Sequence, residues 1–466
     1  MINRQEIQDF SRELGLSPEV VEKDYVLGWL LAGIYNHPDL KTAWIFKGGT
    51  CLKKCYFETY RFSEDLDFTI RAANHINESF LRSALAAVAT WVYDNCGVEI
   101  PPDTISCEIY ENPRGKKAAQ GKMGYRGPLQ PRGSLPRIKL DLTDDERLVL
   151  DPVPREVHHP YSDKPGTGIQ ALCYCYEELF AEKVRALAER LRPRDLYDVI
   201  HFFRHDGIPC DRERVVNTLK EKCVFKGIPM PTFNTLKARP ERAELASEWD
   251  SMLAHQLPKL PPFEHFFSEL PKAFDWLFGM ARKVIVPAYP EGKDVDMAWR
   301  PPVDVKAWNL KVPLEVIRFA AANRLCVDLA YEGSHRLIEP YSLRRTKAGD
   351  IVLYALRHQE GQPRSYRIDK IQGAEATDTP FEPRYTIELT ATGPVSISST
   401  ATRSGGVFVS RPSTARRRSA FGTSFSGPRY IVECTACGKR FSRKGSDTRL
   451  KEHKNKSQEN LHSHLS

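Results

Sequence analysis

The sequence predicts an α/β protein followed by a small all-β domain and a cationic tail. Short apolar strands occur early in the chain, at 44–46, 65–70 and 138–142. Apolar residues at helical spacing dominate from 176 to about 281. Compact β segments separated by Gly and Pro turns follow, which is typical of a small barrel.

The net charge is concentrated at one end of the chain. The 466 residues include 68 Lys and Arg and 60 Asp and Glu, a net charge of +8. Residues 401–466 alone hold 14 basic and 4 acidic residues, so the first 400 carry a charge of −2. This distribution excludes a uniformly basic protein that coats nucleic acid and predicts a near-neutral body with a cationic segment.

Cysteine usage and hydropathy predict a cytoplasmic protein. The 11 cysteines are odd in number and scattered, and the first residues are charged where a signal peptide would be apolar. We therefore expect no disulfide framework and no secretion. The longest apolar run, 26–35, is too short to span a bilayer, so no membrane role is expected.

The elements follow in order along the chain. The first 35 residues predict helices, with Ser17 as an N-cap and Pro18 at the first helical position. The Gly-, Pro-, Lys- and Arg-rich stretch 112–136 indicates a long basic loop or a bent hairpin. The helical pattern of 176–203 is broken at Pro193, which favours the start of a new helix there.

We expect five segments: an α/β region with a helical second part at 1–281, a linker at 282–313, the barrel at 314–392, a disordered basic tether at 393–428 and a last compact unit at 429–466. Within the barrel segment we expect a helix at 314–323 and strands at 326–331, 335–343, 351–357, 365–371 and 385–390.

Three aspartates are candidate metal ligands. Asp65 and Asp67 share one face of a strand because side chains two apart point the same way. Asp141 alternates with apolar residues in its own strand. If the two strands are neighbours, three carboxylates converge, as at sites for one or two Mg²⁺. Two such ions would serve phosphoryl transfer.

A glycine pair supplies a candidate phosphate site. Gly48, Gly49 and Thr50 stand between a strand and a helix, where backbone N–H groups can approach a triphosphate, and Lys53 and Ser63 follow. A glycine turn beside a solvated acidic strand is the ordinary alternative for each feature alone. Their conjunction favours a nucleotide site.

The helical stretch adds cationic candidates. Lys183 is placed to hold a γ-phosphate, and Arg190 or Arg194 the incoming nucleotide, with Asp195 and Asp198 as their supports. The alternative is a salt-bridged helix surface.

These motifs resemble a known family. The patterns GGTxLxK, RxSxDLDF and RDxYD, with EKDY near the start, are similar to those of AbiEii-type nucleotidyltransferases, the toxin halves of type IV toxin–antitoxin and abortive-infection systems. The resemblance covers about 1–281 and implies a polymerase-β-like core followed by a helical domain. It also implies a cognate antitoxin. Some relatives add nucleotides to the 3′ end of tRNA and so stop translation.

The resemblance also implies roles for single residues. Asp141 would be the third acid, although Asp144 and Asp145 lie close by. The other roles are nucleotide binding by Gly49, Thr50 and Lys53, metal binding by Asp65 and Asp67, triphosphate contact by Lys183, and completion of the site by Asp198.

The barrel segment is similar to a WYL domain, an Sm-like barrel of bacterial regulators and defence proteins. The matching runs are EPYSLR at 339–344, LYAL at 353–356 and YRIDK at 366–370, although the eponymous tryptophan is absent. Such a barrel would bind nucleic acid or a small ligand. The candidates are Arg344, Arg345 and Arg367 for charge and Tyr341 or Tyr354 for stacking; the alternative is a core of aromatics with arginines on a solvated rim.

The tail carries a candidate zinc site. Cys434 and Cys437 form a CxxC pair, His453 offers a third ligand, and His462 or His464 a fourth. Fifteen residues separate the pair from His453, which is longer than in DNA-reading fingers. We therefore expect a structural Zn²⁺ motif.

The sequence as a whole predicts a Mg²⁺-dependent nucleotidyltransferase that moves NMP from an NTP to an acceptor hydroxyl on RNA, with the tRNA 3′ end favoured, as a toxin in antiviral defence. Two alternatives remain at this point: a non-enzymatic regulator in which barrel and tail bind nucleic acid, and an enzyme that transfers NMP to a protein hydroxyl.

Overall fold

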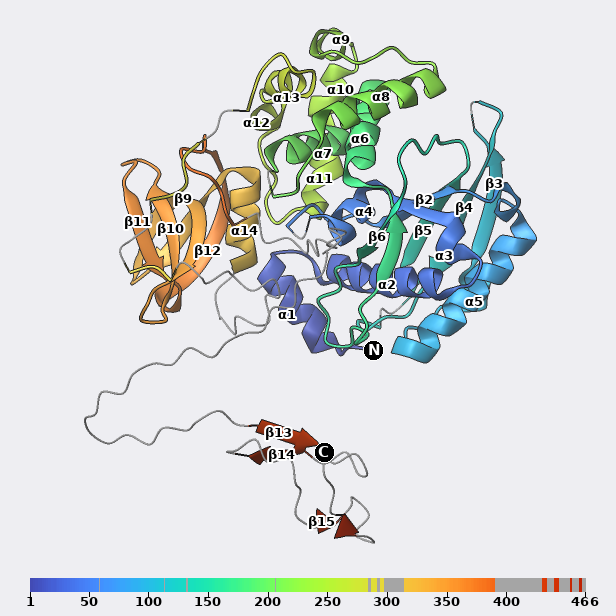
Figure 1. The fold of residues 1–466 in the computed structure, drawn as a ribbon, viewed down its shortest axis with the longest axis horizontal. Helices are drawn as coiled ribbons and strands as arrows, with labels where there is room; N and C mark the ends of the chain where they lie inside the picture. Colours follow the sequence, from blue (N-terminus) through green and yellow to red (C-terminus); the bar gives the residue numbers. More distant parts are fainter. Residues whose placement is uncertain are drawn as a thin grey trace, which may run out of the picture. The chain divides into compact units, whose positions relative to one another are not determined.

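The structure is a computed structural model. It describes residues 1–389 apart from 58, 113, 131–132, 206, 284–285, 291–293 and 297–313, together with the backbone of four short strands between 430 and 462. The chain divides into two compact units, Met1–Ser398 and Ser399–Ser466. The first unit contains both a large mixed sheet and a smaller antiparallel one (Figure 1).

The large sheet has seven strands in the order β3-β4-β5-β2-β1-β7-β6. Only the β2–β5 and β1–β7 pairs are parallel. The strands are β1 Trp44–Lys47, β2 Asp65–Ile70, β3 Ser106–Glu111, β4 Lys117–Gly124, β5 Arg137–Thr143, β6 Val153–Glu156 and β7 Gln170–Cys173. The order matters because it places β2, with its two aspartates, between β1 and β5. Part of the stretch expected to be a basic loop or bent hairpin is thus β4, which pairs with β3 and β5.

The helices next to this sheet begin as the sequence predicts. The helix α2 starts at Pro18 after Ser17, and its residues are buried from Tyr25 to Ile34 because it packs against α5. A Cβ on Gly33 would lie 3.0 Å from Val88, so the glycine lets the two helices approach closely. The bounds are α1 Arg4–Leu14, α2 Pro18–Asn36, α3 Leu40–Ala43, α4 Gly48–Cys55, η1 Ala73–His75, α5 Glu78–Cys96 and η2 Pro102–Thr104.

A group of helices follows the large sheet, as predicted. Leu191 has a positive φ of 46° and ends α6, and Pro193 starts α7. The break confirms the prediction made from Pro193. The bounds are α6 Tyr176–Arg190, α7 Pro193–Arg204, α8 Arg212–Lys226, α9 Phe233–Lys237, α10 Arg242–Ser247, α11 Trp249–Leu253, η3 Ala254–Gln256, α12 Phe263–Phe267 and α13 Leu270–Leu277.

The small sheet is antiparallel, in the order β11-β10-β9-β8-β12. Its elements are α14 Leu314–Asn323, β8 Leu325–Tyr331, β9 Ser334–Arg345, β10 Ile351–Arg357, β11 Pro363–Arg367, η5 Ile368–Lys370 and β12 Ile371–Pro380. The strand expected at 385–390 is wrong, since 381–389 is irregular, and the polar stretch of β12 supplies the fifth strand instead. Pairing with β8, rather than strand propensity, determines β12.

Buried polar contacts join α14 to the helical group. The Arg204 guanidinium on α7 lies 2.8 Å from Glu269 and donates to the Asn323 carbonyl at 3.1 Å. Arg324 lies 3.0 Å from the same Glu269. The Tyr197 hydroxyl donates to the Asn323 amide oxygen at 2.9 Å. Within the first unit, α14 therefore packs directly against the helical group.

Of the segment expected to be a linker, Lys283 lies over the Trp276 ring of α13 at 4.7 Å, and Tyr289 and Val295 pack on the small sheet. Tyr289 is 4% exposed and its hydroxyl donates to the Ala355 carbonyl at 2.9 Å. Val295 forms a β-bridge with Thr346. None of the helices in the described ranges is both long enough and apolar enough to cross a membrane.

In the tail, the structure describes the backbone of four short strands. The strands β13 Tyr430–Glu433 and β14 Arg440–Arg443 form one ladder, and β15 His453–Lys454 and β16 Leu461–His462 another, with His453 opposite His462. The side chains of the zinc candidates, and the tether expected at 393–428, lie outside the described residues. The zinc site stays a prediction.

Candidate active site

The turn from β1 into α4 brings a glycine against an aspartate. Gly48 has φ +79°, and a Cβ there would lie 2.0 Å from an Asp67 carboxylate oxygen. A Cβ on Gly49 would lie 2.7 Å from the Arg61 guanidinium and 3.0 Å from the Ser63 hydroxyl. Both positions therefore need glycine for the close approach of these side chains. The Thr50 hydroxyl donates to the Asp65 carbonyl and fixes the start of β2.

The three predicted acids lie on adjacent strands. In the parallel β2–β5 pair, Asp67 is directly opposite Asp141, and Asp65 is opposite Lys139. Because residues two apart on a strand share a face, all three carboxylates lie on one face of the sheet. Asp145 belongs to a different cluster, since it accepts a hydrogen bond from Asn112 at 2.8 Å. The geometry favours Asp141 as the third acid.

The acids differ in their partners. Asp141 accepts from Lys139 at 2.7 Å and from Gln120 at 3.2 Å. Among the described residues, no side chain donates a hydrogen bond to the carboxylates of Asp65 or Asp67. Burial raises the pKa of both groups, and the nearby charge of Asp141 adds to the shift. Two such carboxylates suit a divalent cation, whose charge would offset the cost of burying them.

Asp198 lies in a buried cluster of cations. Its two oxygens accept from the Arg61 guanidinium at 2.7 and 2.9 Å, from Lys183 at 2.7 Å and from the Tyr60 hydroxyl. Burial alone would raise the pKa of this carboxyl, but Arg61 and Lys183 outweigh it and hold the pKa well below its ordinary value. All four acceptor positions are thus used by protein donors. Asp198 holds cations in place and has no position left for a metal.

The remaining cations surround the aspartates from α6 and α7. Arg190 forms a bidentate pair with the buried Asp195, at 2.7 and 2.9 Å. Arg194 donates to the Met252 carbonyl at 3.4 Å. Both guanidinium charges act on the strand acids, Arg190 on Asp67 and Arg194 on Asp65. The structure therefore brings the sequence-predicted cations to the same place as the acids.

Lys53 lies on α4, one turn after Thr50. It is buried, and its ammonium lies 4.7 Å from the centre of the Phe62 ring. The neighbouring Lys54 is fully buried and pairs with Asp24 of the EKDY motif at 2.6 Å. Asp24 of this motif thus anchors α4 to α2, whereas its neighbour Lys23 pairs with Glu64 at 2.6 Å, and the charge of Lys23 acts on Asp65.

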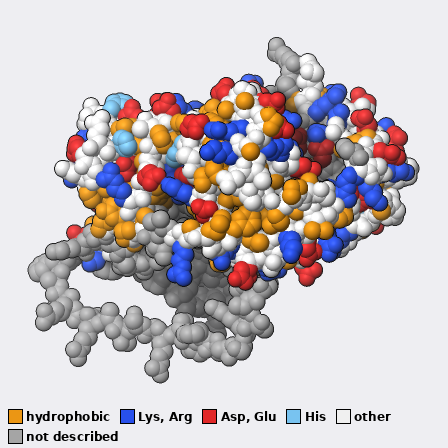
Figure 2. Space-filling view, turned by 90° about the horizontal axis from the view of Figure 1, so that it is seen from above, with side chains coloured by type: hydrophobic (Ala, Val, Ile, Leu, Met, Phe, Trp, Pro, Cys, Tyr) orange, Lys and Arg blue, Asp and Glu red, His pale blue; other side chains and the backbone are white. Residues whose placement is uncertain are grey.

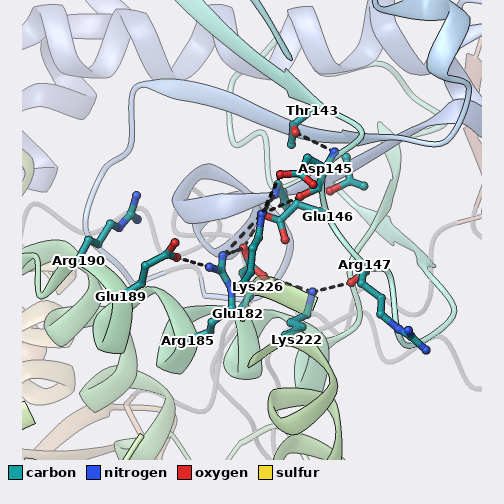
Figure 3. Close-up of polar contacts among 12 residues, drawn as sticks. Thr143, Asp145, Glu146, Arg147, Glu182, Arg185, Glu189, Arg190, Lys222 and Lys226 are labelled. Atoms are coloured by element: carbon teal, nitrogen blue, oxygen red, sulfur yellow. Dashed lines mark hydrogen bonds and ion pairs between the residues drawn. The ribbon is translucent and has the colours of Figure 1, made fainter. Parts of the chain in front are cut away.

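A second buried ion cluster, several of whose members are labelled in Figure 3, lies next to the strand aspartates. Lys47, opposite Asp67 in the sheet, lies 3.7 Å from Glu146 and 3.9 Å from Glu182. Lys222 on α8 lies 2.6 Å from Glu178 and 3.2 Å from Glu182. The cluster also includes Arg185 and Lys226, which pair with Glu146 at 3.6 and 3.2 Å. It joins the loop after β5 to α6 and α8.

Sequence reasoning did not assign roles to the members of this second cluster. They come from four separate segments, and each charge looks like an ordinary surface residue in the sequence. The only indication in the sequence of a role for any of them is the position of Lys47, immediately before the glycine pair.

The WYL-like segment does not present the expected stacking surface. Tyr341 is fully buried in an aromatic cluster with Tyr289 and Tyr385, so its expected stacking role is wrong. Tyr354 stacks on Tyr289 with ring centres 5.2 Å apart. Each candidate guanidinium faces a carboxylate: Arg344 pairs with Glu388, Arg345 with Asp296, and Arg367 with Asp350 and Asp369. Acidic and basic side chains also lie next to one another over the face seen in Figure 2.

Comparison with known proteins assigns the class. The family model "Nucleotidyl transferase AbiEii toxin, Type IV TA system" matches residues 29–279, and the WYL domain model matches 313–376. The chain therefore belongs to the AbiEii nucleotidyltransferase toxin family, is a nucleotidyltransferase, and carries a WYL domain. This membership leaves the non-enzymatic alternative without support. No curated protein matches the chain.

Two solved structures are similar over most of their length. The nucleotidyltransferase toxin MenT4 from Mycobacterium tuberculosis H37Rv shares 18% identity, with 60% of this chain and 91% of that chain covered and a TM-score of 0.40. JHP933 from Helicobacter pylori shares 16% identity, with 57% and 94% covered and a TM-score of 0.37. The assignment rests on the family match.

Proposed function

We propose that this nucleotidyltransferase is Mg²⁺-dependent and transfers NMP from an NTP to a hydroxyl of RNA, the 3′ end of tRNA being the favoured acceptor. The observation that carries the proposal is the convergence of Asp65, Asp67 and Asp141 on one sheet face beside the glycine turn into α4. Asp65 and Asp67 would hold the ion, which when bound neutralises triphosphate charge and activates the attacking hydroxyl.

The surrounding side chains orient the triphosphate. The backbone N–H groups at the start of α4 favour an anion, because the first turn of a helix has unpaired donors and a positive dipole end. Lys183, held by Asp198, contributes a fixed positive charge close to Asp67. Arg190 and Arg194 are the candidates for contact with the incoming nucleotide, because their charges act on Asp67 and Asp65.

A transfer assay tests the proposal. The purified chain, labelled NTPs, Mg²⁺ and total RNA should give labelled RNA, and Asp65→Ala or Asp67→Ala should abolish the label. Asp250→Ala, an exposed aspartate on α11, is the matched control and should retain activity. Label that survives both site substitutions contradicts the proposal.

The acceptor is decided by the same assay in lysate. Label in RNase-sensitive material that maps to tRNA 3′ ends supports the proposed acceptor, whereas RNase-resistant label on protein supports NMP transfer to a protein hydroxyl. The family further suggests a toxin role in antiviral defence with a cognate antitoxin. Growth arrest on expression that requires Asp67 would support that role.

A further inference from the structure

Three cysteines from two elements, α4 and β7, come close together. Cys51 and Cys55 are one turn apart on α4, and Cys173 ends β7; their sulfur atoms all lie within 4.8 Å of one another. All three side chains are fully buried. Within the described part of the chain, no other group of three or more His, Cys, Asp or Glu side chains comes this close together. None of the three is in a disulfide.

The spacing is close to that of a thiolate metal site. A Zn–S bond of about 2.3 Å places the sulfurs of a tetrahedral site about 3.8 Å apart. The present separations therefore need a contraction of at most about 1 Å. Isolated buried cysteines are ordinary core residues, but two of these lie on one helix face and meet a third from a neighbouring strand.

The surroundings supply an oxygen and a compensating charge. The Tyr56 hydroxyl donates to the Tyr174 carbonyl at 2.6 Å and lies 3.8 Å from the Cys173 sulfur, so an oxygen lone pair would be left to complete the site. The Arg155 guanidinium donates to the Cys55 carbonyl at 3.3 Å and lies 4.6 Å from the centre of the Tyr56 ring. Three thiolates and one divalent ion carry a net charge of −1, which Arg155 offsets.

We propose that Cys51, Cys55 and Cys173 form a closed structural site for one thiophilic divalent ion of the zinc class. Complete burial of the three thiols closes the site to solvent and to substrate, so the ion would have no catalytic role. It would instead tie α4, which begins with Gly48 and Gly49, to β7. The site is independent of the proposed function, because metal binding is measured without NTP or RNA.

Metal analysis of the full chain tests the site. In a Cys434→Ser/Cys437→Ser background, which removes the candidate thiols of the tail, the untagged reduced protein purified with Zn²⁺ should contain one zinc per chain by mass spectrometry of its metals. Adding Cys173→Ala should reduce the content to near zero. Cys223→Ala, a buried cysteine on α8 outside the group, should leave it at one.

A Cd²⁺ titration gives a readout that needs no substitution in the group. The Cys434→Ser/Cys437→Ser chain should develop thiolate-to-metal charge-transfer absorption that saturates at one equivalent, together with a higher Tm. This result decides the question even if Cys173→Ala does not fold. The proposal is overturned if the chain contains no zinc and shows no Cd²⁺ absorption, or if mass spectrometry of the unreduced chain finds a disulfide within the group.

Discussion

Asp198 illustrates how one residue supports a site without entering it. Its carboxylate pairs with both Arg61 and Lys183 and holds the two side chains in place. The RDxYD motif marks Asp198 as a candidate site residue, but the sequence could not distinguish a metal ligand from a counter-ion. That distinction depends on the hydrogen bonds from Arg61 and Tyr60, which lie about 140 residues earlier in the chain.

Removing this carboxylate should destabilise the fold. Asp198→Ala leaves the buried Arg61 without its carboxylate partner and Lys183 with only Asp195, at 3.7 Å, which we expect to lower the free energy of unfolding by about 3–5 kcal/mol. Urea denaturation measures the change. The exposed Asp250→Ala should shift the same quantity by less than about 0.5 kcal/mol, and an equal loss in both variants would argue against the counter-ion role.

Gly48 should be irreplaceable for activity. Gly48→Ala places a Cβ on the Asp67 carboxylate in addition to the backbone strain at positive φ, about 1–2 kcal/mol. Displacing the carboxylate by an ångström should cost at least about 100-fold in nucleotidyl transfer. Gly115→Ala has a similar φ of +71° and no atom within 4 Å of its Cβ, so it isolates the effect of the clash. Equal transfer rates in the two variants would contradict the expectation.

At the scale of elements, the hydrophobic pattern of a segment predicted its own secondary structure well. It did not predict a strand whose conformation depends on pairing with another strand. The alternation at 65–70 and the apolar spacing at 314–323 give β2 and α14 with their observed bounds. By contrast, β12 contains Gly, Asp, Thr and Pro and reads as a loop, because its conformation comes from its ladder with β8. The burial of Tyr341 was also hidden, since its ring partners come from residues on both sides of the small sheet's sequence.

The link between α8 and α6 should behave as a coupled ion pair. Lys222→Ala leaves the fully buried Glu178 without its partner at 2.6 Å and should cost about 3–5 kcal/mol of unfolding free energy. The double variant Lys222→Met/Glu178→Leu removes both charges and should recover most of that loss. Chemical denaturation of the single and double variants forms a thermodynamic cycle, and additive losses would show that the pair is not coupled.

At the scale of the molecule, Glu269 connects the helical group to the segment that starts with α14. Burial would raise its pKa, but Arg204 and Arg324 overcome this and lower the pKa to about 2. The pKa of a glutamate in an unfolded chain is about 4.3. Because the folded pKa is the lower one, the ionised form stabilises the fold above about pH 4, and this contribution disappears as the pH falls toward 2.

The titration predicts a pH-dependent difference between variants. At pH 7, Glu269→Gln should lower the unfolding free energy by about 3 kcal/mol, and the difference from the parent chain should shrink progressively between about pH 4 and pH 2. Thermal unfolding across this range measures it. Glu264→Gln, an exposed glutamate on the preceding helix, is the control and should show no such convergence. A constant difference at all pH values would rule out the linkage.

The parallel pairing of β2 with β5 has a consequence for synthesis of the chain. Asp67 pairs with Asp141, which lies 74 residues further along the chain, and Lys183 and Asp198 follow later still. A chain that ends before α7 lacks Asp198, the residue that pairs with both Arg61 and Lys183. We therefore expect such a fragment of this toxin-family enzyme to lack nucleotidyl transfer.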